Sequence, residues 1–509
     1  MTFPLKIEHT LFLMCGIIVR FGRPIQTKKK VLHHRGPDDF RIETIGKCRM
    51  DFTRLSINDT SDNGAQPFIR HNVALVCNGE IYNHKELETG KEYSGSDCEC
   101  LISLIERRGM YAACNEIRGV FAMAWSDGDR LLAARDPFGV RPLFYSRDQD
   151  GITLASEIKA FGGAKAEIFP PGHFYDSFLD DFVCYYNAYW TPQAINLSSM
   201  KAVFIEAVRK RVSNTDREVG FFLSGGLDSS LVVAVAKDIL GKDKIRTFST
   251  GQADSPDTIA ALRVADYLGV NHTNVPFNFA EGIESIPSVI NSLESYDTTT
   301  VRASTPMWLL CKWIKENTDC RVILSGEGSD EIFGGYKYFQ LSPNEDEFHM
   351  ETIRRVRLLH QFDVLRADRC TSAHGLELRV PFLDRDFVDL VMQTNPSLKR
   401  TKEEKKILRD AFEGYLPDHI LRRPKDAFSD AVGYGWVDHA RSHGEKVMNE
   451  ATFETIQMQS DQHNVPTTKE EAWYRREFWE YYQSHNDHVI SEMWRPRWTS
   501  VTDPSARKI

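Results

Sequence analysis

The sequence contains no uninterrupted apolar run approaching the roughly 18 residues that a membrane-spanning helix requires. Its first residues hold only the short apolar run Leu11–Met14, whereas a secretory signal peptide needs about 7–15 apolar residues. The sequence therefore predicts a cytoplasmic protein that has no membrane partner.

Paired CxxC motifs are also missing, although the chain has ten cysteines. Cys98 and Cys100 lie too close together for a usual zinc pair, and no cluster of histidines accompanies them. The pattern predicts reduced, mostly buried thiols rather than a disulfide framework.

An excess of positive charge is a third feature that the chain lacks, because its formal net charge is −9. Binding of nucleic acid leaves a basic footprint, so we expect no nucleic-acid partner. A nucleotide is not excluded, since a small phosphate site needs only local hydrogen-bond donors.

The length of 509 residues exceeds what one ordinary hydrophobic core supports, so we expect two domains. Strand-like runs separated by Gly, Asp and Asn turns predict an α+β domain over residues 15–193. From residue 197, helical patterns alternate with short buried strands. This alternation predicts an α/β domain over 197–483, with a parallel sheet and helices on both faces. Residues 484–509 are predicted to form an irregular tail.

A glycine-rich loop in the second domain follows the apolar run Val219–Leu223 and opens a helix that we expect to begin near Ser230. Free N–H groups at a helix N-terminus suit phosphate, and glycines let the backbone approach the anion closely. Asp228 would repel phosphate unless a cation lay between them, which predicts Mg²⁺. An ordinary Gly-rich turn is the alternative. The loop residues expected to bind ATP are Ser224, Gly225, Gly226, Asp228 and Ser229.

A second, acidic loop occupies Ser325–Glu331, directly after another buried strand. Because parallel strands end at the same edge of a sheet, we expect this loop to face the first one across the nucleotide. Asp330 would then share Mg²⁺ with Asp228, and Glu327 would act as a general base on incoming ammonia. A solvated acidic turn is the alternative.

The string SGGLDSS at 224–230 resembles the pyrophosphate-binding loop of the ATP pyrophosphatase (PP-loop) superfamily. Members of that superfamily release pyrophosphate and leave AMP on the substrate, so the resemblance implies adenylation. It also implies which residues lie around the adenosine, namely Phe222, Thr250, Ser325 and Gly326.

Short motifs follow one another in the first domain: CG at 15–16, HRGPD at 34–38, RLSI at 54–57, NGEIYN at 78–83 and SDCE at 96–99. In this order they resemble the class II glutamine amidotransferases, which are N-terminal-nucleophile (Ntn) hydrolases. The resemblance implies that Cys15 attacks the glutamine amide while its own α-amine serves as the base.

The same resemblance implies roles in a glutamine pocket. Arg54 would hold the α-carboxylate with its planar fork, and Asp97 would pair with the α-ammonium group. Asn78 and Gly79 would form the oxyanion hole. The other residues of the implied pocket are Leu55, Ser56, Ile57, Asn58 and Glu80.

Two of these motifs also have purely structural interpretations. NGE is a common hairpin turn, and SDCE has the pattern of a helix capping box with Ser96 as N-cap and Glu99 at N3. Both roles can hold simultaneously.

The position of Cys15 is unusual for an Ntn hydrolase, because the preceding residues convert its α-amine into an amide. Met14 directly precedes Cys15. We therefore expect either that translation begins at Met14 or that a propeptide over 1–14 is cleaved.

A class II glutaminase joined to a PP-loop domain is similar to the asparagine synthetase family, from Cys15 to about residue 483. The resemblance implies synthesis of L-asparagine from L-aspartate, with ATP and Mg²⁺, through β-aspartyl-AMP and with ammonia from L-glutamine. It implies that Lys425 stabilises charge on the phosphate, for which a surface lysine is the alternative. β-Lactam synthetases are the closest rival, but they generally lack the nucleophilic cysteine. The oligomeric state stays open, with a homodimer as one option.

Overall fold

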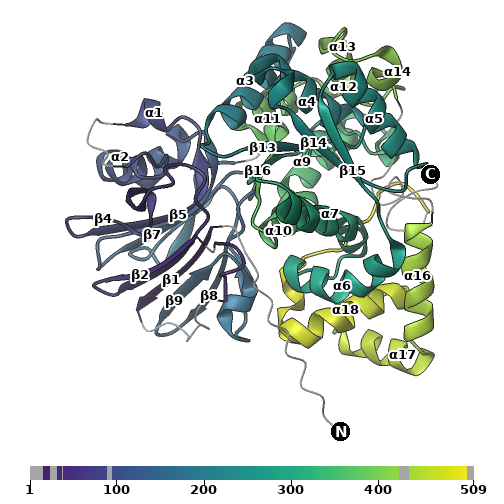
Figure 1. Cartoon of the computed structure of the whole chain (residues 1–509). Coiled ribbons are helices and arrows are strands. Elements are labelled where there is room, and N and C mark those ends of the chain that lie inside the picture. The colour runs from purple at the N-terminus through teal and green to yellow at the C-terminus, as the bar shows by residue number, and fades with distance from the viewer. Residues whose placement is uncertain are drawn as a thin grey trace.

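The computed structural model describes residues 15–22, 31–36, 38–88, 94–187, 189–423 and 435–500. Figure 1 shows two halves side by side, the first coloured purple to blue and the second teal to yellow. The first half is built mainly of strands and the second mainly of helices around one sheet.

The first half consists of two antiparallel sheets, ordered β10-β8-β9-β1-β3-β2 and β12-β11-β7-β6-β5-β4. Strands that follow one another in the chain often pair directly, as β2 pairs with β3 and β5 with β6. Their bounds are β1 Gly16–Gly22, β2 Asp39–Ile45, β3 Cys48–Arg54, β4 Phe68–Arg70, β5 Val73–Ile81, β6 Gly119–Ser126, β7 Leu131–Arg135, β8 Phe144–Asp148, β9 Gly151–Ala155, β10 Glu167–Ile168, β11 His173–Asp176 and β12 Asp181–Cys184.

The core of this half lies between the two sheets. Ile17 and Val19 of β1 belong to the same buried apolar cluster as Val76 of β5 and Ala124 of β6. The alternate residues of β5 face away from this core, toward the helices α1 (His84–Leu87) and α2 (Cys100–Glu116). The two-sheet arrangement confirms the predicted α+β character of the first half.

The second half contains a parallel sheet with the strand order β15-β14-β13-β16-β17. Helices α3, α4 and α5 lie above the sheet in Figure 1, and α7 and α10 lie below it. A parallel sheet with helices on both faces was the prediction for this half, and it is confirmed. The strands are β13 Val219–Phe222, β14 Arg246–Thr250, β15 Asn271–Val275, β16 Val322–Leu324 and β17 Glu377–Arg379.

The remaining helices extend the second half away from the sheet. Of the last three, in yellow-green and yellow in Figure 1, α16 and α18 pack beside α6, and α17 packs against α18. The bounds are α3 Leu197–Ser213, α4 Leu227–Leu240, α5 Pro256–Leu268, α6 Phe279–Leu293, α7 Thr298–Asn317, α8 Ser329–Phe333, α9 Glu345–Leu358, α10 Asp363–Ser372, α11 Arg385–Met392, α12 Pro396–Lys399, α13 Lys406–Ala411, α14 Asp418–Leu421, α16 Trp436–Val447, α17 Glu450–Gln459 and α18 Lys469–Tyr482.

The segment predicted to be a tail contains the 3-10 helix η7 (Ser484–Val489) and then continues without regular structure to residue 500. Its side chains are nevertheless packed, because Ile490 and Trp494 are buried. The segment therefore contributes to the core of the second half.

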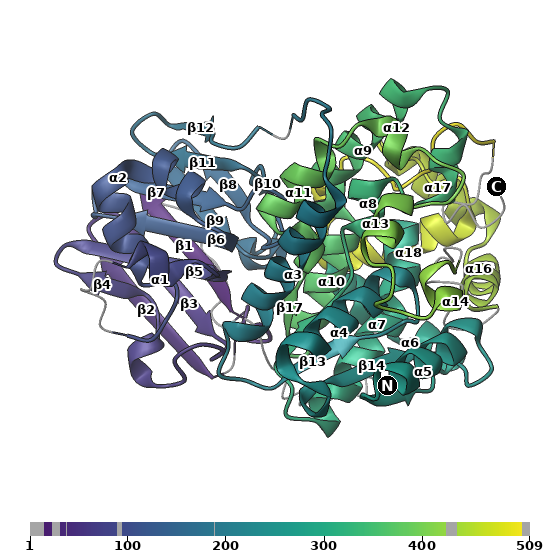
Figure 2. The same cartoon turned by 90° about the horizontal axis from the view of Figure 1, so that it is seen from above.

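The two halves meet along β17, the edge strand of the parallel sheet. Glu377 and Arg379 of β17 form ion pairs with Arg141 and Glu80 of the first half. Figure 2, a view from above, shows β17 at the boundary between the two halves. A charged edge strand thus joins the sheet to the other half rather than facing solvent.

The predictions about thiols and membranes can be compared with this structure. Eight of the ten cysteines are buried, while Cys184 is exposed and Cys15 is half-buried, so the prediction of mostly buried thiols is confirmed. Within the described ranges, no helix is both long enough and apolar enough to cross a membrane.

Candidate functional site

Cys15 lies at the start of β1, half-buried, with its sulfur facing the backbone of Leu55. The Leu55 N–H donates to Sγ at 3.2 Å, and Sγ lies 3.4 Å from the Leu55 carbonyl oxygen. Burial raises the pKa of the Cys15 thiol to about 12. The sulfur is therefore a thiol near neutral pH, and its use as a nucleophile requires a base beside it.

Asn78 and Gly79 lie near the end of β5. Asn78 is 1% exposed, and within the described part of the chain its Nδ2 has no hydrogen-bond partner. An unpaired buried amide donor is costly unless a ligand uses it. Packing alone also requires glycine at position 79, because a Cβ there would lie 2.4 Å from the Val120 carbonyl oxygen.

Two carboxylates, Asp97 and Glu80, are buried close to this amide. Asp97 accepts a hydrogen bond from the Ile81 N–H at 2.6 Å, and burial raises the pKa of Asp97. Burial and the neighbouring Asp97 also raise the pKa of Glu80, whereas Arg379 acts in the opposite direction. Ionisation of these two carboxyl groups is therefore costly in the empty pocket, and an ammonium group placed beside them would favour their charged form.

Arg54 and the residues after it form the opposite wall. Arg54 donates from Nη1 to the Ser61 carbonyl at 2.7 Å and from Nη2 to the Asp59 carbonyl, which fixes the guanidinium plane. Asn58 donates to Glu80 at 2.8 Å. The structure therefore brings the predicted residues of the glutamine pocket into one region, including Leu55, Ser56 and Ile57.

The capping-box interpretation of SDCE holds only for Ser96, whose Oγ accepts a hydrogen bond from the Cys98 N–H at 3.4 Å, and not for Glu99. Helix α2 begins at Cys100, and its N-cap residue Glu99 makes no side-chain capping bond. The Glu99 carboxylate is instead bonded to Ser94 and paired with Arg70 at 3.1 Å. A tertiary ion pair has taken the place of the Glu99 half of the box, and the regular helix starts after the turn that Ser96 caps.

The glycine-rich loop has the predicted strand–loop–helix context, but α4 begins at Leu227 rather than near Ser230. The first turn of the helix therefore includes Asp228 and Ser229. Gly225 has φ +73°, and a Cβ there would lie 2.4 Å from the Ala261 nitrogen of α5. Only glycine fits this position without strain.

Hydroxyl groups line the loop. The Ser224 N–H donates to Ser229 Oγ at 3.2 Å, and the Gly226 N–H lies 3.3 Å from Ser224 Oγ. Ser230 is fully buried, and in the described chain its Oγ has no hydrogen-bond partner. The loop thus carries donors suited to an anion.

The acidic loop touches the glycine-rich loop as predicted. A Cβ on Gly326 would lie 2.9 Å from the Ser229 nitrogen, so the two backbones are in close contact. The Ser325 N–H donates to the Arg379 carbonyl at 3.0 Å. Phe222 and Thr250 lie at the ends of the neighbouring strands β13 and β14, on the same edge of the sheet.

Lys405 is a central residue that the sequence patterns did not reveal. Its Nζ lies 2.5 Å from Asp228 Oδ2 and 2.6 Å from Asp330 Oδ1, and the side chain is 2% exposed. It occurs in the run TKEEKK at 401–406, where nothing local distinguishes it from a surface charge. Glu327 is likewise paired, with Arg366 at 2.9 Å.

The two aspartates fit a magnesium ion by their chemistry. Mg²⁺ prefers oxygen ligands and is commonly held by one or two carboxylates together with substrate phosphates. Asp228 and Asp330 are brought to a common point, since one ammonium group contacts both. Lys425 and Pro37, which belong to predicted motifs, lie outside the described residues.

Comparison with known proteins agrees with this division into two sites. A family model described as glutamine amidotransferase domain matches residues 14–174, and one described as asparagine synthase matches residues 199–344 and 340–504. A protein of Acanthamoeba polyphaga mimivirus, named probable glutamine-hydrolyzing asparagine synthetase, is 43% identical over 97% of this chain and 99% of its own length. The chain belongs to the glutamine-hydrolysing asparagine synthetase family.

Further members of this family match over similar spans. The asparagine synthetase of Triphysaria versicolor is 39% identical over 97% of this chain and 93% of its own length. The probable asparagine synthetase of Dictyostelium discoideum is 39% identical over 97% and 98%. The resemblance that the motifs indicated is therefore confirmed across both halves of the chain.

Proposed function

We propose that this member of the asparagine synthetase family makes L-asparagine from L-aspartate with ATP, using ammonia that it releases from L-glutamine. The observation that carries the proposal is the presence of two complementary sites in one chain. Cys15 and the open Asn78 amide lie in the first half, and the paired loops with Asp228 and Asp330 lie in the second.

In the first half, Cys15 Sγ attacks the side-chain amide of glutamine, and the α-amine of Cys15 accepts the thiol proton. Asn78 Nδ2 and the Gly79 N–H stabilise the oxyanion that develops. Arg54 and Asp97 bind the two ends of the amino acid, and the hydrogen bond from Asn58 to Glu80 joins the two segments of the pocket. Collapse of the oxyanion breaks the C–N bond and releases ammonia, which takes back the proton held by the α-amine, and leaves a γ-glutamyl thioester on Cys15. Water then hydrolyses this thioester to glutamate and the free thiol.

This role of the α-amine requires that residues 1–14 be absent from the active enzyme. Intact-mass measurement of the active protein tests the requirement. A mass that corresponds to a chain beginning at Cys15 supports the mechanism. A fully active chain that retains residues 1–14 would show that another base acts.

In the second half, the β-carboxylate of aspartate attacks the α-phosphorus of ATP, giving β-aspartyl-AMP and pyrophosphate. Mg²⁺, held by Asp228 and Asp330, would neutralise charge on the phosphates. The loop residues Ser224–Ser229 and Ser325–Gly326 bind the nucleotide, beside Phe222 and Thr250. Glu327 takes a proton from ammonia as it displaces AMP, and Lys425 stabilises the phosphate charge.

We assign the first half to the Ntn-hydrolase sandwich fold and the second to the PP-loop fold, with domains at 15–193 and 197–483 followed by 484–509. Support comes from the face-to-face sheets and from the break between β12 and α3. The free, mostly buried thiols support a cytoplasmic location. Homodimer formation stays a prediction.

The proposal is tested by the stoichiometry of products. Purified protein is incubated with aspartate, glutamine, ATP and Mg²⁺, and all products are measured in the same reaction. We expect equal amounts of asparagine, AMP and pyrophosphate, with at least as much glutamate. Release of ADP and orthophosphate would overturn the adenylation mechanism.

A further inference from the structure

Arg35 connects the backbone of the proposed nucleophile to a buried cluster of charges. The Arg35 side chain is fully buried, and its Nε donates to the Cys15 carbonyl oxygen at 3.0 Å. Its Nη1 and Nη2 donate to Glu157 at 2.7 Å and to Asp368 at 3.1 Å. Because a guanidinium is planar and rigid, the two carboxylates determine where Nε meets Cys15.

Glu157 is the carboxylate on which several cations converge. It follows β9 and is 1% exposed. Its Oε1 accepts a hydrogen bond from Arg35 Nη1 at 2.7 Å and forms an ion pair with Arg369 Nη1 at 2.6 Å. Its Oε2 contacts His34 Nε2 at 2.8 Å and Lys159 Nζ at 2.7 Å. Although burial opposes ionisation, these neighbours hold the pKa of Glu157 well below its usual value, so the group is a carboxylate.

Arg369 belongs to the other half of the molecule, on helix α10. It is fully buried, and its Nη2 pairs with Glu294 at 2.8 Å while its Nη1 pairs with Glu157. Glu294, also from the second half, accepts the N–H groups of Ile158 and Lys159 at 2.8 and 2.9 Å. Together, Arg369 and Glu294 hold the short segment after β9 that carries Glu157.

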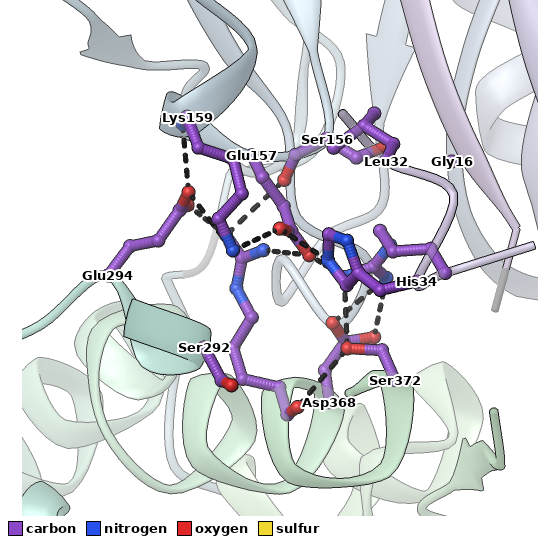
Figure 3. Close-up of polar contacts among 12 residues, drawn as sticks. Gly16, Leu32, His34, Ser156, Glu157, Lys159, Ser292, Glu294, Asp368 and Ser372 are labelled. Carbon is purple, nitrogen blue, oxygen red and sulfur yellow. Dashed lines mark hydrogen bonds and ion pairs between the residues drawn. The ribbon is translucent and has the colours of Figure 1, made fainter. Parts of the chain in front are cut away.

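Figure 3 shows this arrangement from the side. Asp368 and Ser372 lie on helix α10 of the second half, while Glu157, Lys159 and His34 come from the first half. Dashed contacts run between the two groups. The cluster therefore joins the two halves through ion pairs whose carboxylates are almost fully buried.

Helix α10 also reaches the ATP site. Arg366, one turn before Arg369, pairs with Glu327 of the acidic loop at 2.9 Å. One rigid helix thus contacts the acidic loop at one position and the cluster behind Cys15 at another.

We infer that Arg369 is a positioning residue for glutamine hydrolysis, contributed by the ATP-dependent half. It fixes Glu157, Glu157 fixes Arg35, and Arg35 fixes the main chain of Cys15. This inference rests on the proposed role of Cys15 as the nucleophile. It extends the glutaminase beyond its own domain, because the orientation of the nucleophile depends on a side chain of the second half.

The geometry explains why an arginine is needed at this position. Arg369 uses two different nitrogens to bind two different carboxylates. A lysine has one ammonium nitrogen and cannot reproduce the fork, although it keeps the charge. Buried ion pairs also contribute little net stability compared with apolar packing, so stability alone does not account for this network.

The test compares Arg369→Lys and Glu157→Gln with the unchanged full-length chain. For both variants we expect the kcat of glutamine hydrolysis to fall by about 10–100-fold with little change in KM, because a small misplacement of the nucleophile affects the reacting geometry most. Asparagine synthesis from added ammonium should stay within about twofold, since the ATP site keeps its residues. The double variant should have a kcat of glutamine hydrolysis no lower than that of the less active single variant. The reason is that both changes interrupt the same series of contacts from Arg369 through Glu157 to Arg35.

Arg475→Lys provides the matched control. Arg475 is also fully buried and pairs with a carboxylate, Asp487, at 2.5 Å, but it lies on α18 away from Cys15. We expect this control to lower the melting temperature while leaving the kcat of glutamine hydrolysis unchanged.

Several results would overturn the inference. Unchanged glutamine hydrolysis in Arg369→Lys would do so, as would a parallel loss of both activities. An equal loss in Arg475→Lys would assign the effect to general destabilisation. The Cys15→Ala variant tests the proposed function separately. If Cys15 is not the nucleophile, this variant still hydrolyses glutamine.

Discussion

The two candidate sites differ in how their polar groups are held before any substrate arrives. In the glutamine pocket, Asn78 Nδ2 has no partner in the described chain, while Arg54 is fixed by backbone carbonyls. In the nucleotide site, the carboxylates of Asp228 and Asp330 are already paired with Lys405. The first site is preorganised for its ligand, whereas the second must exchange an internal partner for a ligand.

This difference follows from the charge of the two ligands. Glutamine is a neutral zwitterion, so the empty pocket can leave one amide donor without a hydrogen bond at a modest cost in stability. Mg²⁺ and ATP bring large opposite charges, and two adjacent carboxylates without a cation would repel each other. Lys405 supplies that cation within the protein, which keeps the loops together. The comparison predicts that the two sites can be damaged independently.

The largest separation is expected from Cys15→Ala. The change removes the nucleophile, so glutamine-dependent asparagine synthesis should fall by about 10⁴-fold or more. Synthesis from ammonium should be retained, because the second half is untouched. Assays with each nitrogen source check this, and loss of both activities would show that the sites are not separable.

The opposite pattern is expected from Asp228→Asn. Loss of one carboxylate weakens cation binding at the nucleotide, so asparagine synthesis from either nitrogen source should fall by about 10³-fold. Glutamine hydrolysis should continue. Asp238→Asn on the exposed side of the same helix is the matched control and should change neither activity.

A smaller effect is expected from Asn78→Ala. Removing one oxyanion donor should lower the kcat of glutamine hydrolysis by about 10²-fold, with KM nearly unchanged. Steady-state kinetics measure both constants. A raised KM with the original kcat would show that Asn78 binds the substrate rather than the transition state.

Gly225→Ala tests the close approach of the nucleotide loop to α5. Positive φ and a contact at 2.4 Å should together lower the free energy of unfolding by about 2–4 kcal/mol. Gly269→Ala, at the C-terminal end of α5, has φ +67° in the left-handed region, and its added Cβ would lie 3.7 Å from the nearest atom, an ordinary contact. Its loss should be about 1 kcal/mol, so denaturant titrations of both variants isolate the steric contribution. Equal losses would contradict the close approach.

The smallest effect concerns Lys399, a buried lysine of the second half that donates only to the carbonyls of Ile332 and Val391 among the described residues. Burial lowers the pKa of Lys399 to about 7, below its value of about 10.4 in the unfolded chain. Between these values the unfolded chain binds more protons, so stability rises with pH across that window and is lost as pH falls toward 7.

Lys399→Met removes this cost and two hydrogen bonds. We expect the variant to be more stable than the original chain by about 1–2 kcal/mol at pH 6, with the advantage shrinking at pH 9. Thermal unfolding at both pH values measures the difference. An advantage that grows with pH would contradict the assigned burial cost.

The features that the sequence predicted are local in the chain, and the features that it missed depend on contacts between distant residues. Strands and short motifs are local, and their hydrophobic pattern and turn residues alone indicated an α+β first half, a parallel sheet in the second half, and both loops. The start of α4 was misplaced because Gly226 caps the helix through its backbone and leaves no side-chain signal. The Glu99 half of the capping box failed because Glu99 pairs with a distant arginine.

The missed site residues depend on contacts between distant positions. Lys405 and Asp228 are 177 residues apart in the chain, and Arg369 and Glu157 come from different halves. A lysine in a charged run has no local feature that reveals burial. Such pairs become visible only when the topology brings the two segments together.

The edge strand β17 has a consequence for producing each half alone. Glu377 and Arg379 face partners in the first half, and β17 is the last strand of the sheet. Cutting the chain between the halves would expose the outer edge of this strand and would leave Glu377 and Arg379 with only each other as partners among these contacts. An exposed edge strand can pair with the edge strand of another copy. We therefore expect the separated second half to aggregate under conditions in which the whole chain stays in solution.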